Sequence, residues 1–92
     1  MTEIEKKTEV EKESTKDNKK KIVIYNDDFN TIEHVINCIV KYCNHSVKDA
    51  IELTLDIHEK GASITNEGSE KELTPIREAL NGKGLDVIME DL

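Results

Sequence analysis

Apolar residues in the first half of this chain follow a strand pattern and then a helix pattern. The run from Lys21 to Tyr25 (KIVIY) is β-branched and aromatic and leads into residues 26–28 (NDD), which predicts a strand closed by a turn. From Ile32 to Cys43 apolar residues recur three and four positions apart, as on the buried face of an amphipathic helix. Either Asn30 or Thr31 can cap that helix.

A second helix and a short strand are predicted next. Ser46 and Asp49 form a start similar to a capping box, and Gly61 suits the position just past a helix C-terminus. We therefore expect a helix between Ser46 and Gly61. Residues 62–65 (ASIT) are a strand candidate, and residues 66–68 (NEG) predict a turn after it.

The third helix has two candidate starts. Ser69 and Glu72 offer a capping box, but Pro75 would then remove a backbone donor inside the helix and kink it. Alternatively, the helix starts at Thr74, which places the proline in the first turn. Leu85 to Glu90 (LDVIME) alternates as a final strand. The order strand, helix, helix, strand, helix, strand predicts an α+β domain, with a three-stranded antiparallel sheet packed against three helices.

Composition divides the chain into two parts. Residues 1–21 hold seven lysines and six acidic residues but few apolar ones, which predicts a disordered, charged N-terminal extension. Residues 22–92 hold six basic and fourteen acidic residues and form the expected folded domain. The lysine cluster Lys19–Lys21 is expected on the linker, so the composition argues against nucleic acid as a partner. An acidic surface suits cationic partners, such as the α-ammonium group of a peptide.

The sequence also predicts the cellular location of the protein. No apolar run reaches the roughly 20 residues of a membrane span, and the N-terminus lacks a signal-peptide core. We therefore expect a cytoplasmic protein that binds no membrane. Cys38 and Cys43 lie five residues apart in one predicted helix, which points them to different faces and predicts two reduced thiols.

Two features break their local pattern. His58 lies on the apolar stripe of the second helix, either as a neutral core histidine or as a contact to a ligand. Residues 26–28 carry three acceptor side chains, which either bond their own backbone or receive a cation. A carboxylate beside a neutral amide suits an α-ammonium group, whose N–H donors must be paired where apolar walls exclude water.

Motifs for catalysis or metal binding are sparse. No Gly-framed nucleophile is present, and Asp28 and His58 lack a Ser or Cys partner, so we expect no enzymatic activity and no cofactor. His34 and Cys38 lie four residues apart, but no second close pair completes a tetrahedral metal site. We expect no metal at the candidate ligands, which are His34, Cys38, Cys43, His45 and His58.

Two motifs together resemble one family. The segment IVIYNDDFNTIEHVI is similar to the signature of the ClpS family, in which an aliphatic strand runs into Asn-Asp-Asp, an aromatic residue, Thr-Pro and a helix. His58, thirty residues after Asp28, and Gly61 beyond it resemble the family's His-x-x-Gly. The likeness covers residues 22–92. It implies a non-enzymatic adaptor that binds substrates by a bulky N-terminal residue, the N-degron; a monomer is the default expectation. The adaptor would deliver them to the N-terminal domain of a ClpA-like AAA+ ATPase in a bacterial Clp protease.

The resemblance also implies roles for individual residues. Asn26 and His58 would bind the α-amino group, and Asp28 would help to hold the amine and the first peptide group. Asn30 completes this amine- and peptide-binding set. The implied hydrophobic pocket consists of Ile32, Val35, Thr54, Ile57 and Leu85.

The pocket departs from the family pattern at several positions. Ile32 and Thr54 each replace a methionine, and residues 30–31 (NT) replace Thr-Pro. Methionine adapts to its guest, whereas a β-branched side chain is confined at χ1. The preferred N-terminal residue, leucine or an aromatic, therefore stays open.

A second surface concerns the ATPase partner. Glu72 and Arg77 in KELTPIREAL resemble in spacing the residues by which the family docks on the ATPase, and the alternative is a solvated helix face. The extension 1–21 resembles the family's N-terminal extension, which engages the ATPase. Two other functions remain open: a ClpS-like recognition domain of a ubiquitin ligase, and a docking domain without a pocket, similar to the C-terminal domain of the ribosomal stalk protein.

Overall fold

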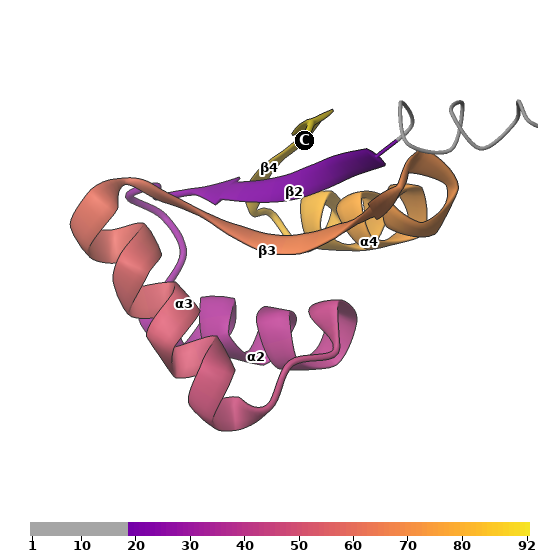
Figure 1. Ribbon diagram of the computed structural model, residues 1–92. Coiled ribbons are helices and arrows are strands. Elements are labelled where there is room, and N and C mark those ends of the chain that lie inside the picture. Colours follow the sequence, from indigo (N-terminus) through magenta and orange to yellow (C-terminus); the bar gives the residue numbers. More distant parts are fainter. Residues whose placement is uncertain (1–18) are drawn as a thin grey trace, which may run out of the picture.

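The computed structural model describes residues 19–92 (Figure 1). Its elements are strand β2 (Lys19–Tyr25), helix α2 (Ile32–Cys43), helix α3 (Val47–Lys60), strand β3 (Ala62–Ser69), helix α4 (Glu70–Gly82) and strand β4 (Asp86–Asp91). This is the predicted order of elements. None of these helices has the length and apolar character needed to cross a membrane. Residues 1–18 of the predicted N-terminal extension lie outside the described residues.

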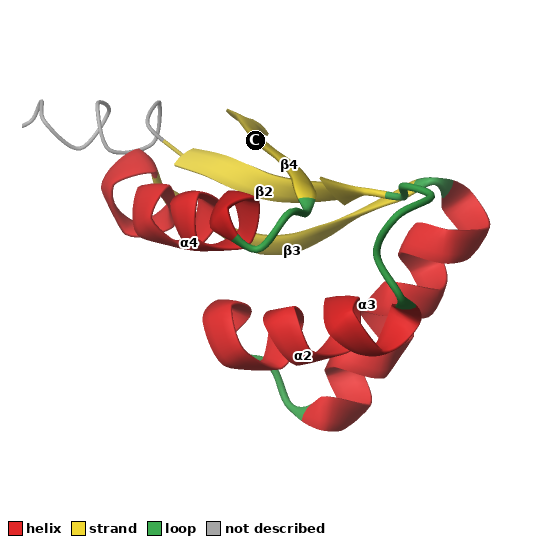
Figure 2. Ribbon diagram, turned by 180° about the vertical axis from the view of Figure 1, so that it is seen from behind, coloured by secondary structure: helices red, strands yellow, loops and turns green. Residues whose placement is uncertain are grey.

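The sheet has β2 at its centre. Its strand order is β3-β2-β4, and both pairs are antiparallel. The three helices lie on one side of the sheet, as the two opposite views show (Figures 1 and 2). Ile22 and Ile24 of β2 are buried in the same apolar cluster as Ile39 of α2 and Leu80 of α4. The predicted α+β fold, with a three-stranded antiparallel sheet and three helices, is confirmed.

Capping residues set the ends of α2 and α3. Thr31, and not Asn30, caps α2, because its Oγ1 accepts a hydrogen bond from the His34 amide at 3.1 Å. Ser46 caps α3 as predicted. Gly61 ends that helix with φ 93°, in the left-handed region that favours glycine. The β2–α2 loop therefore ends, and the α3–β3 connection begins, at a well-defined helix end.

The first strand extends further than predicted. The lysine cluster Lys19–Lys21 lies in β2 and not on a linker, which corrects the expectation from composition. Two of these lysines pair with acidic residues of β4: Lys20 Nζ contacts Asp91 Oδ1, and Lys21 Nζ lies 3.8 Å from Glu90 Oε1. Opposite charges directly across an antiparallel pair stabilise it, which offsets the low strand preference of lysine.

Strand β3 is also longer than predicted, and the predicted turn at 66–68 is wrong. These residues pair with the lysine end of β2. Thr65 forms a β-bulge, since Asn66 and Ile64 on either side of it face consecutive β2 residues. His45 meets this bulge, with its Nε2 2.6 Å from the Thr65 carbonyl oxygen. Pairing with β2 therefore overrides the turn-like composition.

Helix α4 uses the capping box. The Glu72 amide donates to Ser69 Oγ at 3.1 Å, and the Ser69 amide donates to Glu72 Oε1 at 3.0 Å. Pro75 consequently lies inside the helix, and the alternative start at Thr74 is wrong. Gly68 precedes the cap residue Ser69, and a Cβ there would lie 2.6 Å from Glu72 Oε1, so a larger residue would displace the capping carboxylate.

The two cysteines are part of the interior. Cys38 and Cys43 are buried free thiols, as predicted. Burial raises the pKa of both thiols, because the charged thiolate is disfavoured away from water. Both are therefore protonated at neutral pH and serve the packing.

Candidate functional site

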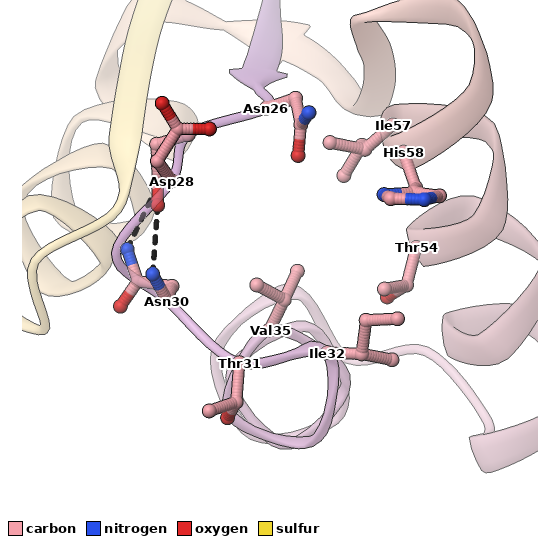
Figure 3. A pocket seen from close by; sticks show the side chains of 10 residues that line it. Asn26, Asp28, Asn30, Thr31, Ile32, Val35, Thr54, Ile57 and His58 are labelled. Atoms are coloured by element: carbon pink, nitrogen blue, oxygen red, sulfur yellow. Dashed lines mark hydrogen bonds between the residues drawn. The ribbon is translucent and has the colours of Figure 1, made fainter.

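A cavity of about 330 Å³ opens between the β2–α2 loop, the start of α2 and the C-terminal half of α3 (Figure 3). Its lining residues are Asn26, Asp27, Asp28, Asn30, Thr31, Ile32, Val35, Thr54, Ile57 and His58. Eight of the nine predicted amine-binding and pocket residues are in this set. The fold therefore brings together two segments that the sequence analysis treated as separate features.

Asp27 organises the loop that forms one side of the cavity. Its Oδ1 accepts hydrogen bonds from the amides of Phe29 and Asn30, both at 2.8 Å. Its Oδ2 accepts from Asn30 Nδ2 at 2.8 Å. The hydrogen bonds from Asn30, with that from the Phe29 amide, hold the pKa of Asp27 below its ordinary value. Asp27 is thus the Asx-turn residue that the sequence offered as one alternative.

The loop is also tied to its neighbours at both ends. The Asn26 amide donates to the Gly61 carbonyl at 2.9 Å, which fixes the end of β2 to the end of α3. Asn30 Nδ2 donates to the Gly84 carbonyl at 2.9 Å, which fixes the loop to the α4–β4 connection. Gly84 has φ 89°, a conformation that favours glycine. These contacts hold the loop against two other parts of the fold.

Asn26 and Asp28 differ from Asp27 in their side-chain contacts. Within residues 19–92 the side-chain hydrogen bonds of this loop belong to Asp27, Asn30 and the N-cap Thr31, and the Asn26 and Asp28 side chains make none. Both residues are exposed at the cavity. The backbone-bonding interpretation of this turn is therefore confirmed for Asp27, whereas the cation-receptor interpretation stays a prediction for Asn26 and Asp28.

His58 faces the loop from α3. It is exposed and lines the cavity, so its interpretation as a buried core histidine is wrong. The core position belongs to its neighbour Ile57, which is 3% exposed. Figure 3 shows His58, Ile57 and Thr54 along one side of the opening, Asp28 on the opposite side and Asn26 between them at the end of β2. Hydrogen-bond acceptors thus converge from two elements on one opening.

The inner wall of the cavity is mainly apolar. Ile57 and Val35 contribute aliphatic side chains, and Ile32, 47% exposed, lies at the mouth. Leu85 is the predicted pocket residue that does not line the cavity. It is 4% exposed in the main core, where its amide bonds the Leu80 carbonyl at 3.2 Å. The α4–β4 connection reaches the site through the Gly84 backbone instead.

Two lining residues were missed by the sequence analysis. Asp27 lines the cavity, and the Asx-turn propensity of the segment was its signal. Thr31 lines it as the N-cap of α2, a role that the sequence did predict as an alternative. Both residues shape the site through local backbone geometry, so neither stands out as a ligand group in the sequence.

The predicted docking residues lie elsewhere, on α4. Glu72 is exposed, but its carboxylate is already part of the capping box. The hydrogen bonds from Ser69, the backbone one foremost, hold the pKa of Glu72 below its ordinary value. Arg77 Nη2 lies 3.9 Å from Oε2 of the adjacent Glu78. Glu72 and Arg77 project about 140° apart around the helix, on either side of the buried face that Leu73 and Leu80 form.

Comparison with known proteins identifies a family. The model of the family described as ATP-dependent Clp protease adaptor protein ClpS matches residues 15–87. The ATP-dependent Clp protease adapter protein ClpS of Thermosynechococcus vestitus is 38% identical over 66 residues, which cover 71% of this chain and 70% of that protein. The protein of the same name in Synechocystis is 36% identical over 66 residues, covering 71% and 67%.

A solved structure has the same fold. The structure of Agrobacterium tumefaciens ClpS2 bound to L-phenylalaninamide matches with a TM-score of 0.75 and covers 83% of this chain and 99% of that one. The two sequences are 17% identical, so this match concerns the fold alone. It agrees with the predicted order of elements and with the three-stranded antiparallel sheet.

Proposed function

This chain belongs to the ClpS family of adaptor proteins for the ATP-dependent Clp protease, and we propose that it captures proteins through a bulky hydrophobic N-terminal residue and delivers them to the protease's AAA+ ATPase. The family is one of adaptors and not of proteases. The chain itself, in this proposal, makes and breaks no bond, needs no cofactor and acts as a monomer in the bacterial cytoplasm.

One observation carries the proposal: free acceptors and an apolar wall share a single cavity. An α-ammonium group has three N–H donors and no acceptor. Asn26, Asp28 and His58 offer acceptors for those donors at the cavity, and Asp28 adds a compensating negative charge. Asn30, which holds the loop, would lie beside the first peptide group. The proposed ligand is therefore a chain terminus with a free amine.

The apolar wall selects the side chain of that terminal residue. Val35 and Ile57 would contact a large apolar side chain such as that of leucine or phenylalanine. L-phenylalaninamide, the ligand of the Agrobacterium protein, combines a free amine with an apolar side chain. A ligand of the same kind would satisfy both parts of the cavity here.

The expected affinity is moderate. Hydrogen bonds to a charged amine contribute about 1.5–3 kcal/mol each, and burial of one large apolar side chain contributes about 1.5–3 kcal/mol. Association and ordering costs offset several kcal/mol of this gain. We therefore expect dissociation constants on the order of micromolar or somewhat lower.

Delivery would use a different surface. We propose that Glu72 and Arg77 on α4 dock on the N-terminal domain of a ClpA-like ATPase, and that the N-terminal extension also engages the ATPase. Both residues lie on α4, away from the residues that line the cavity. Substrate capture and docking can then occur at the same time.

The proposal can be tested with labelled peptides in fluorescence anisotropy. A peptide that begins with leucine should bind, whereas the same peptide with glycine first, or with an acetylated leucine, should not. Acetylation removes the charge that Asp28 would pair with and adds bulk at the amine. Equal binding of the free and acetylated peptides would contradict the proposed site.

The alternative functions fit less well. A docking domain similar to the ribosomal stalk protein needs no pocket, so the cavity and the family match both argue against it. A ubiquitin-ligase recognition domain would share the pocket, but the relatives that match are Clp protease adaptors. The family match and the cavity therefore both favour the adaptor function.

A further inference from the structure

The cavity contains one buried polar atom with no partner. Thr54 is 3% exposed and lines the cavity, yet within residues 19–92 its Oγ1 has no hydrogen-bond partner. Buried hydroxyl groups in proteins are almost always hydrogen-bonded, since an unpaired one loses its bonds to water without replacement. The Thr54 hydroxyl is thus an unpaired hydrogen-bonding group that lies almost completely covered in an otherwise apolar wall.

The usual partner of a helical threonine is absent here. Threonine in a helix commonly donates to the carbonyl one turn earlier, and Thr74 in α4 does so, with its Oγ1 2.7 Å from the Glu70 carbonyl. The Thr54 hydroxyl makes no such bond. Figure 3 shows the Thr54 side chain directed toward the interior of the opening, between His58 and Ile32. The hydroxyl therefore has no partner in its own helix, and a small shift of the side chains that cover it would bring it into contact with a guest.

Its position relative to His58 indicates what kind of guest. The two residues are four apart on α3, which corresponds to one turn and a rise of about 6 Å. His58 is exposed and Thr54 is buried, so the cavity deepens from His58 toward Thr54. A ligand with its amine near His58 would therefore bring the far end of its side chain toward Thr54.

We propose that Thr54 makes the pocket selective for an N-terminal tyrosine over phenylalanine, through a hydrogen bond between the Thr54 hydroxyl and the phenol hydroxyl. This inference rests on the proposed function. A tyrosine side chain has an apolar body, which Val35 and Ile57 would contact, and a polar tip. Both hydroxyls can donate and accept, so the bond can form in either direction. Phenylalanine would fill the same space but leave Thr54 unpaired and shielded from water.

The test compares peptides that differ only in their first residue. Tyrosine, phenylalanine, glycine and acetylated tyrosine would be measured by competition anisotropy against the full-length protein and its Thr54→Val and Thr54→Ser variants. Valine has nearly the shape of threonine without the hydroxyl, and serine keeps the hydroxyl. Thr74→Val is the matched control, because it removes a helical threonine hydroxyl outside the cavity.

We expect the wild-type protein to bind the tyrosine peptide about tenfold more tightly than the phenylalanine peptide. Thr54→Val should bring this ratio close to one by weakening tyrosine binding, whereas Thr54→Ser and Thr74→Val should keep it. A ratio near one in the wild-type protein, or an unchanged ratio in Thr54→Val, would overturn the inference. If free-amine peptides still bound better than acetylated ones, the proposed function would stand. If no free-amine peptide bound at all, both would fail.

Discussion

In both the β2–α2 loop and the start of α4, a carboxylate accepts hydrogen bonds from nearby backbone amides. Asp27 accepts backbone amides within its loop, and Glu72 accepts the Ser69 amide at the N-terminus of α4. These hydrogen bonds lower the pKa of each carboxyl group. The two regions differ in whether a further carboxylate remains free to bind a partner molecule. The loop has a second carboxylate, Asp28, that is free at the cavity, whereas on α4 the proposed docking residue is itself the capping residue.

This difference determines how function can be separated from stability. In the loop the two roles belong to adjacent residues, so single substitutions should affect one role each. On α4 the two roles coincide in Glu72, so a deletion of its side chain removes both. Four predictions use this contrast, in order of decreasing effect.

The largest effect is expected from Asp28→Ala. Loss of a charged acceptor for the ligand amine should weaken binding of a leucine-initiated peptide by about 10- to 100-fold. The melting temperature should stay unchanged, because the Asp28 side chain bonds no other residue of the described chain. Asp86→Ala on β4 is the matched control, since it removes an exposed aspartate away from the cavity. Equal losses in both variants would show that only the net charge matters.

The adjacent substitution, Asp27→Ala, should act mainly on stability. The loop would lose three hydrogen bonds to a carboxylate, and we expect the free energy of unfolding to fall by about 1–2 kcal/mol. Urea unfolding at pH 7 measures this, with Asp28→Ala as the control that should not change. A larger stability loss in Asp28→Ala than in Asp27→Ala would contradict the assignment of loop stability to Asp27 and ligand binding to Asp28.

The pH dependence of the Asp27 contribution follows from the lowered pKa. A carboxyl group with a lower pKa in the folded state stabilises the protein above its unfolded pKa, about 3.9 for aspartate. This stabilisation is lost as the pH falls through the folded-state pKa. The difference between wild type and Asp27→Ala should therefore be full at pH 7 and shrink below about pH 4. A difference that persists in acid would mean that the carboxylate charge is not its source.

Short-range signals predicted most of the fold and the site. Ser46, Ser69 and Gly61 set helix ends through contacts within three or four residues, which a sequence displays directly. The paired motifs around Asn26 and His58 predicted eight of the ten residues that line the cavity. Where the deciding contact is local, or where a motif already implies the tertiary contact, sequence is sufficient.

The errors have tertiary causes. Residues 66–68 extend β3 because β2 supplies pairing partners, and no local pattern announces that. His58 is exposed because the loop after β2 leaves an opening beside α3, while Leu85 is buried in the main core, where its amide bonds the Leu80 carbonyl of α4. The unpaired hydroxyl of Thr54 also depends on the rotation of α3, and composition shows only that a polar residue is present.

The smallest effect is expected from Glu72→Gln, and it separates the two roles that coincide on α4. Glutamine also serves in a capping box, because its side-chain oxygen accepts the Ser69 amide. The melting temperature should therefore stay close to that of wild type. The negative charge is lost, so binding to the N-terminal domain of a ClpA-like ATPase should weaken by about two- to fivefold, the size expected for one exposed ion pair. Glu72→Ala should show the same loss of binding together with a lower melting temperature, since the cap is lost as well. If Glu72→Gln bound the ATPase like wild type while Glu72→Ala did not, Glu72 would act through the helix N-terminus alone, and docking would depend on the position of α4 instead of the Glu72 charge.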